Sequence, residues 1–166
     1  MKRLIIIMML FAPMAVMAQK FGHVDYQSIS TTLPEIAKIN GELQAIAQQY
    51  ENDLKAMQDE FQRKADEYEK AKATMNATTQ KETEASLQEM LQKIQQTTAQ
   101  NQQDFQKKQQ ELYAPVQQKI LKAIQNVGQA GQYTYIFPYS PDLLLYVGAT
   151  AKDVTAEVKA ELNKLK

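Results

Sequence analysis

The chain has no cysteine and no tryptophan among its 166 residues. Without cysteine, no disulfide can cross-link the fold and no thiol near the N-terminus can accept a lipid. Stability must therefore come from packing or from oligomerisation. Histidine occurs once, and no group of His, Asp or Glu has the spacing of a metal site. We expect no cofactor and no metal.

Motifs for catalysis are equally scarce. His23 lies near Asp25, so a catalytic His–Asp pair is conceivable, but the chain has no cysteine and no serine in a nucleophile motif. Packing or subunit contact by a strand residue is the favoured interpretation of His23. Gly128 and Gly131 lack the lysine and the strand-to-helix order of a phosphate-binding loop. The sequence does not predict an enzyme.

Proline and glycine are almost missing from the middle of the chain. Between Glu35 and Ala114 there is no proline, and Gly41 is the only glycine. Apolar residues recur there at steps of three or four, which predicts a helix with a seam for a neighbouring helix. The seam of this first helix comprises Ile36, Ile39, Leu43, Ile46, Tyr50, Leu54, Met57, Phe61, Ala65 and Tyr68. Pro34 suits its first turn.

The helical pattern breaks at "ATMNATTQKE", residues 73–82. We predict a tip near residues 74–79 and, because Thr79 and Glu82 fit a capping box, a second helix from about Gln80. The return seam comprises Leu87, Leu91, Ile94, Thr98, Phe105, Leu112, Val116 and Ile120. Between Ile94 and Phe105 it holds no large apolar residue, so we expect a thin, flexible stretch.

Residues 34–112 therefore form a long antiparallel helical hairpin, resembling a coiled coil, which we call the arm. Each helix of about 40 residues would be roughly 60 Å long. That is too long for a compact globule of this mass, so we expect the arm to project. Pro115 predicts a kink or a helix restart, and Gly128 and Gly131 predict a helix end.

The N-terminal residues 1–18 have the layout of a signal peptide. Lys2 and Arg3 precede an apolar stretch, and Ala18 ends a run of small residues suited to cleavage. The alternative is an uncleaved membrane anchor, for which the apolar stretch is short. Cleavage would leave 17 basic and 19 acidic residues. This near-neutral balance argues against nucleic acid as a partner.

The two ends of the chain predict a small amount of sheet. Phe21–Ile29 fits a short strand, and "YTYIFPYSPDLLLYVG", residues 133–148, fits a β-hairpin with Pro138 and Pro141 in its turn. A last amphipathic helix begins at Asp153 or Thr155. Along one of its sides lie Val154, Val158, Leu162 and Leu165.

One strand and one hairpin are too little sheet to be stable alone, and their edges invite pairing with other chains. We therefore predict an α+β subunit in which residues 19–33 and 113–166 form a β body shared between several copies. The predicted oligomer-interface residues are Val24, Tyr135, Ile136, Phe137, Leu144 and Tyr146. Base stacking or carbohydrate contact is the alternative for the aromatic cluster of Tyr133, Tyr135, Phe137, Tyr139 and Tyr146.

The terminal blocks resemble a known family. "FGHVDYQSISTTLPE", "LYAPVQQKILKAI", "YTYIF", "LLLYV" and "DVTAEV" closely resemble the Skp (OmpH-like) periplasmic chaperones over residues 20–165. The resemblance implies a jellyfish-like homotrimer, with a central β body and three arms around a cavity. It also implies an ATP-independent periplasmic holdase that keeps unfolded outer-membrane β-barrel proteins soluble.

A holdase needs adaptable apolar contacts, and methionine is flexible and suits promiscuous surfaces. The candidate client-binding residues are Met57, Phe61, Tyr68, Met75, Met90 and Phe105. The alternative is that these side chains only pack the two arm helices together. The best-known members of the family are strongly basic, which is thought to attract lipopolysaccharide. The near-neutral charge here argues against peripheral contact with lipopolysaccharide or the membrane, and no residue is assigned to it.

A different class of function is also open. A structural spacer or adaptor of the cell envelope could use the arm as a rod between membrane layers. Such a protein would need a continuous, well-filled seam and a fixed partner, whereas the sequence predicts a thin seam between Ile94 and Phe105.

Overall fold

The computed structural model describes residues 19–140 and 142–165. The predicted signal peptide, residues 1–18, and Pro141 of the predicted turn lie outside this range. The chain is mostly helical with a small sheet, as the α+β prediction required. In order, the elements are β1 (Phe21–Val24), α2 (Tyr26–Thr32), α3 (Pro34–Ala71), the 3₁₀ turn η1 (Lys72–Thr74), α4 (Ala77–Ala130), β2 (Tyr135–Pro138), β3 (Lys152–Asp153) and α5 (Thr155–Leu162).

These elements divide into two units. A helical unit spans Ile29–Ile120, and a sheet unit combines residues 19–28 with residues 121–140 and 142–165. None of the helices in the described ranges is both long and apolar enough to cross a membrane.

The sheet has three parallel strands in the order β2-β1-β3. Phe21 pairs with Tyr135 and His23 with Phe137, so β1 is central although it comes first in the chain. The predicted β-hairpin over residues 133–148 is therefore wrong. β2 pairs with β1 instead, and Leu143 and Leu144 donate to the Ser140 carbonyl in a turn. Parallel pairing needs a long crossover, which the helices between β1 and β2 supply.

The strand at the N-terminus is shorter than Phe21–Ile29. It ends at Val24, and Asp25 caps α2 by accepting the Ser28 backbone N–H at 2.8 Å. This Asx cap is what ends the strand, because it favours a helical first turn over continued pairing. Within β1 the predicted alternation is confirmed: Gly22 and Val24 are buried, whereas Phe21 is exposed.

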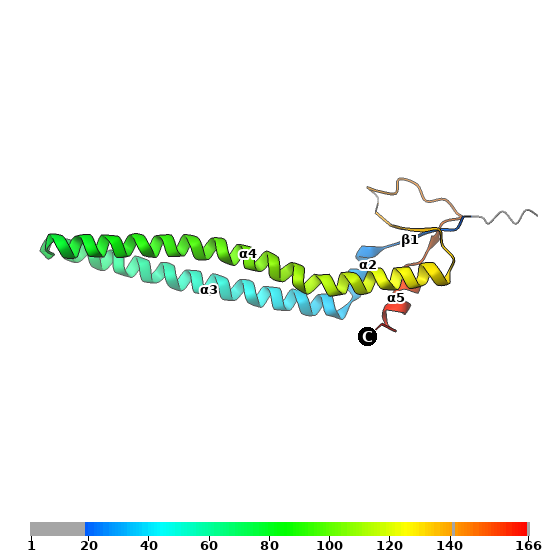
Figure 1. The fold of residues 1–166 in the computed structure, drawn as a ribbon, viewed down its shortest axis with the longest axis horizontal. Helices are drawn as coiled ribbons and strands as arrows, with labels where there is room; N and C mark the ends of the chain where they lie inside the picture. Colours follow the sequence, from blue (N-terminus) through cyan, green and yellow to red (C-terminus); the bar gives the residue numbers. More distant parts are fainter. Residues whose placement is uncertain (1–18, 141, 166) are drawn as a thin grey trace, which may run out of the picture. The chain divides into compact units, whose positions relative to one another are not determined.

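In the helical unit, α3 and α4 lie side by side and are joined through η1 (Figure 1). α3 begins at Pro34, as predicted, and every predicted seam position from Ile36 to Tyr68 is buried or half-buried. The break between the helices, residues 72–76, overlaps the predicted tip near residues 74–79. The predicted capping box is wrong, however, because α4 begins at Ala77, and Asn76 Oδ1 accepts the Thr79 N–H at 2.9 Å.

The return seam of α4 differs from the prediction in its polar stretch. Leu91 is 43% exposed and Thr98 is exposed, so both predictions are wrong. The predicted seam residues Leu87, Ile94, Phe105 and Leu112 are half-buried, and five further positions are half-buried with them: Met90, Thr97, Asn101, Asp104 and Lys108. The helix keeps its three–four spacing even where the seam residues are polar, because the partner helix continues alongside.

Pro115 lies inside α4, so of the two predicted alternatives the helix restart is wrong, and the kink stays a prediction. Proline has no backbone N–H, so one intrahelical hydrogen bond is missing at this position. Val116 and Ile120 are buried after it, and their packing stabilises the helix despite that loss. The helix ends at Ala130, near the predicted glycines. Gln132 adopts φ 54°, and the Tyr133 N–H reaches the Gly128 carbonyl at 3.0 Å, as in a Schellman motif.

The last helix, α5, begins at Thr155 as predicted. The Thr155 backbone N–H and hydroxyl both donate to Asp153 Oδ1, at 2.9 and 2.6 Å. Val154, Val158 and Leu162 are buried in the sheet unit, which agrees with the prediction that they lie along one side of the last helix. The Asp25 backbone N–H donates to Thr155 Oγ1 at 2.9 Å, which ties α5 to the end of β1.

Candidate functional site

One face of the sheet carries exposed aromatic side chains. Because opposite residues of parallel strands point to the same face, Phe21 and His23 of β1 share a face with Tyr135 and Phe137 of β2. The rings of Phe21 and Tyr135 stack with centroids 6.3 Å apart, and Tyr135 and Phe137 lie 5.8 Å apart. Tyr135 is 59% exposed. We call Phe21, Tyr135, Phe137 and Tyr139 the aromatic face.

The predicted interface residues fall into two groups. Val24 is buried and Ile136 half-buried within this chain. Tyr135, Phe137 and Tyr146 are exposed, and Leu144 is half-buried. The structure brings Tyr135 and Phe137 together on the aromatic face. Their role in an interface stays a prediction.

The segment after β2 adds further exposed apolar residues. Leu143, Leu145 and Tyr146 are 68%, 91% and 85% exposed. Large apolar side chains with this exposure are costly in water, and several together indicate a contact surface. Among the large apolar side chains exposed in the described residues, Leu91 alone belongs to the helical unit, and the others belong to the sheet unit.

His23 lies beside the aromatic face. Its ring is 5.4 Å from that of Tyr139, and its Nδ1 atom is buried without a hydrogen-bond partner. His23 is opposite Asp153 on β3, yet Asp153 Oδ1 already accepts from Thr155. Within the described residues, no cluster of His, Cys, Asp or Glu could hold a metal ion. The geometry agrees with a packing role for His23.

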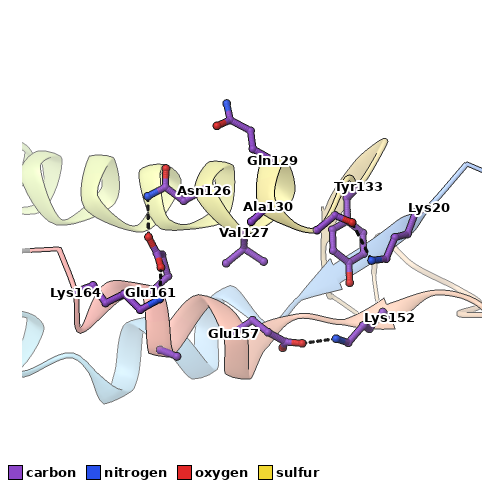
Figure 2. A pocket seen from close by; sticks show the side chains of 12 residues that line it. Lys20, Asn126, Val127, Gln129, Ala130, Tyr133, Lys152, Glu157, Glu161 and Lys164 are labelled. Carbon is purple, nitrogen blue, oxygen red and sulfur yellow. Dashed lines mark hydrogen bonds and ion pairs between the residues drawn. The ribbon is translucent and has the colours of Figure 1, made fainter.

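A groove of about 660 Å³ also opens in the sheet unit. Figure 2 shows that the last turns of α4, α5 and the segments around Lys20 and Lys152 line it. Lys20 Nζ donates to the Gly131 carbonyl at 2.8 Å and lies 4.2 Å above the Tyr133 ring. A Cβ at Gly131 would come within 2.4 Å of the Tyr133 ring, so any other residue there would force the ring to move.

The remaining charges of this groove are paired with one another. Lys152 meets Glu157 at 2.5 Å, which raises the pKa of the lysine and lowers that of the glutamate. Lys164 lies 2.9 Å from Glu161, which also accepts from Asn126. Hydrogen bonds from both lower the Glu161 pKa. Because each charge already has a partner, the groove holds the unit together rather than presenting a reactive group.

The six candidate client-binding residues lie on the helical unit. Tyr68 is buried, and the others are half-buried: Met57, Phe61, Met75, Met90 and Phe105. All six occupy seam or tip positions, so they pack α3 against α4 and present only part of their surface. Sequence reasoning placed Met90 outside the return seam. The structure places it inside.

Near the tip, a hydrogen bond crosses between the two helices. The Tyr68 hydroxyl donates to Glu84, and Lys72 Nζ lies 5.2 Å from the Tyr68 ring centroid. The hydrogen bond and the Glu84 charge raise the Tyr68 pKa to about 12. A cleft of about 480 Å³ beside Tyr68 is also lined by Met75 and Leu87.

Farther along, two clefts flank Tyr50. One of about 490 Å³ is lined by Ala47, Tyr50, Asn101, Gln102, Phe105, Gln106 and Gln109. The other, of about 400 Å³, is lined by Ile46, Gln49, Tyr50, Asp104, Lys107, Lys108 and Glu111. Sequence reasoning missed Asn101 and Asp104. Continuing the three–four steps from Met90 through Ile94 would have found them.

The comparisons with known proteins agree on one family. The profile of the outer membrane protein (OmpH-like) family matches residues 20–162. The chain belongs to the OmpH-like family. A candidate outer membrane chaperone (OmpH-like) from Caulobacter crescentus CB15 has a similar fold, with a TM-score of 0.75 at 18% identity. The match covers 88% of this chain and 85% of that one. No curated protein sequence matches significantly.

Membership in the OmpH-like family confirms the resemblance drawn from the terminal blocks. The family match runs through both units, since residues 20–162 include β1, the two long helices and α5. Both the exposed apolar surface of the sheet unit and the clefts of the helical unit therefore belong to the part of the chain that the OmpH-like family shares.

Proposed function

We propose that this OmpH-like protein is an ATP-independent periplasmic holdase that keeps unfolded outer-membrane β-barrel proteins soluble. The family match over residues 20–162 carries this proposal. The chaperone assignment of the structurally similar Caulobacter protein supports it. Export would use residues 1–18 as a cleavable signal peptide.

We propose further that the working form is a homotrimer with a jellyfish-like arrangement. Phe137 and Leu145 illustrate the support: they are large apolar side chains, 43% and 91% exposed in one subunit. Burying such residues between copies would remove apolar surface from water at about 25 cal/mol per Å². One β body shared between three subunits would place three helical units around a common cavity.

Client binding would use partly exposed apolar side chains between hydrophilic ones. Met57, Phe61 and Phe105 are half-buried, so each leaves part of its surface to a client. Contacts of this size are individually weak, and weak contacts allow release without nucleotide hydrolysis. The near-neutral chain contributes little long-range attraction, so affinity would depend on these short-range contacts.

Dilution of an unfolded β-barrel precursor tests the holdase. The precursor is diluted from urea into buffer with or without an equimolar amount of the mature trimer, and light scattering follows aggregation. We expect scattering to be suppressed. Aggregation that proceeds unchanged would exclude the holdase.

A structural spacer remains the second candidate. A rod that bridges membrane layers gains stiffness from a filled apolar seam. Here Thr97, Asn101 and Asp104 occupy consecutive seam positions of α4, which disfavours a stiff rod. A spacer would also leave precursor aggregation unaffected, so the dilution assay separates the two.

A further inference from the structure

The residue that follows the predicted signal peptide is a glutamine, Gln19. Cleavage after Ala18, which belongs to the proposed export, would make Gln19 the N-terminal residue of the mature chain. Its side-chain amide and a free α-amine would then belong to one residue. The amine can reach the amide carbon by closing a five-membered ring, and a reaction within one residue is far faster than the same reaction between two molecules.

The structure leaves the Gln19 side chain free to react. Gln19 is exposed and precedes β1, which begins at Phe21. In the part of the chain that the structure describes, the Gln19 side chain has no hydrogen-bond partner. No contact with the sheet unit therefore holds the amide away from the neighbouring backbone nitrogen.

The next residue, Lys20, is anchored to the sheet unit. Its carbonyl accepts the Thr134 N–H at 2.8 Å, and its Nζ donates to the Gly131 carbonyl, also at 2.8 Å. Figure 2 shows the Lys20 side chain beside Tyr133, and Nζ lies 4.2 Å from the ring centroid. The mature chain would therefore extend beyond this anchor by Gln19 alone.

We propose that Gln19 is converted to pyroglutamate once the signal peptide has been removed. This inference rests on the proposed export of the chain. The lone pair of the α-amine attacks the side-chain amide carbon, so that an N–Cδ bond forms and the Cδ–Nε2 bond breaks. Nε2 takes a proton from the amine and leaves as ammonia, and no oxidant, reductant or water is consumed. The reactive neutral amine is available, because α-amino groups have a pKa of about 8.

The lactam would protect the Lys20 anchor. Aminopeptidases bind a free α-amine, and exposed chain ends are where proteolysis concentrates. Removal of Gln19 and Lys20 would delete the two hydrogen bonds that Lys20 makes to Thr134 and Gly131. Because β1 is the central strand, loss of the anchor at its start would affect the pairing on both sides.

The first experiment measures the N-terminal peptide of the protein isolated from its own cells. An endoproteinase that cleaves before aspartate releases residues 19–24, because Asp25 is the first aspartate of the chain. We expect this peptide to lack the mass of one ammonia, about 17 Da, in most of the molecules. The control is a synthetic, isotopically labelled peptide of the same sequence, which is added at lysis and should stay open. An endogenous peptide that keeps its ammonia, or one cyclised no further than the control, would overturn the inference.

The second experiment measures protection from aminopeptidase. Full-length wild type and Gln19→Ala are produced in the same cells, and the mature proteins are incubated with a broad-specificity aminopeptidase. Alanine suits the cleavage site but has no amide to cyclise. We expect the variant to lose residues 19 and 20 about tenfold faster than wild type, as read from the intact mass. Wild type treated first with pyroglutamyl peptidase should be trimmed like the variant. Equal trimming of variant and untreated wild type would refute the protective role.

Failure of this modification and failure of the proposed function are distinguishable. An open peptide of residues 19–24 would leave the proposed export standing and remove the modification. A peptide that begins before Gln19 would remove the predicted cleavage and the modification together. A cyclised peptide from a protein that does not suppress precursor aggregation would support the modification and exclude the holdase.

Discussion

Lys119 Nζ lies 2.7 Å from Glu35 Oε1, joining α4 to the first turn of α3 within the helical unit. The two residues are 84 positions apart in the chain. The hydrogen bond from Lys119 lowers the pKa of the Glu35 carboxyl from its ordinary value of 4.5. The pair therefore fastens the end of the helical hairpin opposite its tip, provided Glu35 is ionised.

Removing this ion pair should destabilise the helical unit slightly. The two side chains are 25% and 38% exposed, so Lys119→Met should cost only about 0.5 kcal/mol at pH 7. Because the folded-state pKa of Glu35 is lowered, the stabilisation is present above pH 4.5 and disappears as pH falls through the lower folded value. Urea unfolding followed by circular dichroism should show a difference between wild type and variant at pH 7 that vanishes at about pH 2. A difference that persists there would contradict the electrostatic origin.

Tyr68 should titrate apart from the other tyrosines. The chain has eight tyrosines, and Tyr68 alone donates to a carboxylate across the helical hairpin near its tip. Its pKa is raised to about 12, so ultraviolet titration should show one phenol ionising in that range. The stabilisation from this bond is present below pH 10 and is lost as pH rises through about 12. In Tyr68→Phe the late step should be missing. A late step that remains would assign it to another tyrosine.

The Asn76 side chain should be required for a stable tip. Its Oδ1 accepts the Thr79 N–H at 2.9 Å and the Thr79 hydroxyl at 3.1 Å. Asn76→Ala should cost about 1 kcal/mol of unfolding free energy, the ordinary loss for an N-cap. Asn76→Asp keeps the acceptor and should unfold within a few tenths of a kcal/mol of wild type. Equal unfolding of the alanine variant and wild type in urea would show that the cap contributes little.

Oligomeric state should depend on the exposed segment after β2. Multi-angle light scattering of the mature chain should give about three times the monomer mass. Leu145→Asp places a charge on a side chain that is 91% exposed in the single subunit, and should dissociate the trimer. Thr150→Asp, an exposed polar position in the following turn, is the control and should stay trimeric. A trimeric Leu145→Asp protein would move the interface elsewhere, and a monomeric wild type would exclude the shared β body.

The long helices were predictable because apolar residues recur at steps of three or four over many turns. Ile39, Leu43 and Tyr68 are buried where the three–four spacing placed them. The predictions were wrong where a single residue was used to place a helix end, at the start of α4 and at Pro115. Asn76 caps α4 in place of Thr79, since both are capping residues and sequence alone does not rank them. Pro115 is tolerated because Val116 and Ile120 are buried beside it, which is a tertiary effect.

Two of the three strands were predictable in position, but their pairing was not. β3 (Lys152–Asp153) was not predicted, and the second strand of the predicted hairpin is not formed. Phe21–Val24 and Tyr135–Pro138 are strands, as their composition indicated. Their parallel arrangement could not be deduced, because alternation shows which side chains share a face and not which strand is the partner. Of the candidate site, Phe105, the α3 seam residue Tyr68 and the tip residue Met75 were predicted from the sequence. Asn101 did not, since a polar residue in a seam carries no apolar signal.

The central position of β1 has a consequence for the order of folding. Its partners, Tyr135–Pro138 and Lys152–Asp153, follow it by more than a hundred residues, and closing so long a loop costs conformational entropy before any strand pairs. Helices form from local contacts and faster. Once Glu35 meets Lys119, the effective loop between β1 and β2 shrinks to a few tens of residues. We therefore expect the sheet to assemble last, with its rate governed by how quickly the two long helices find their register.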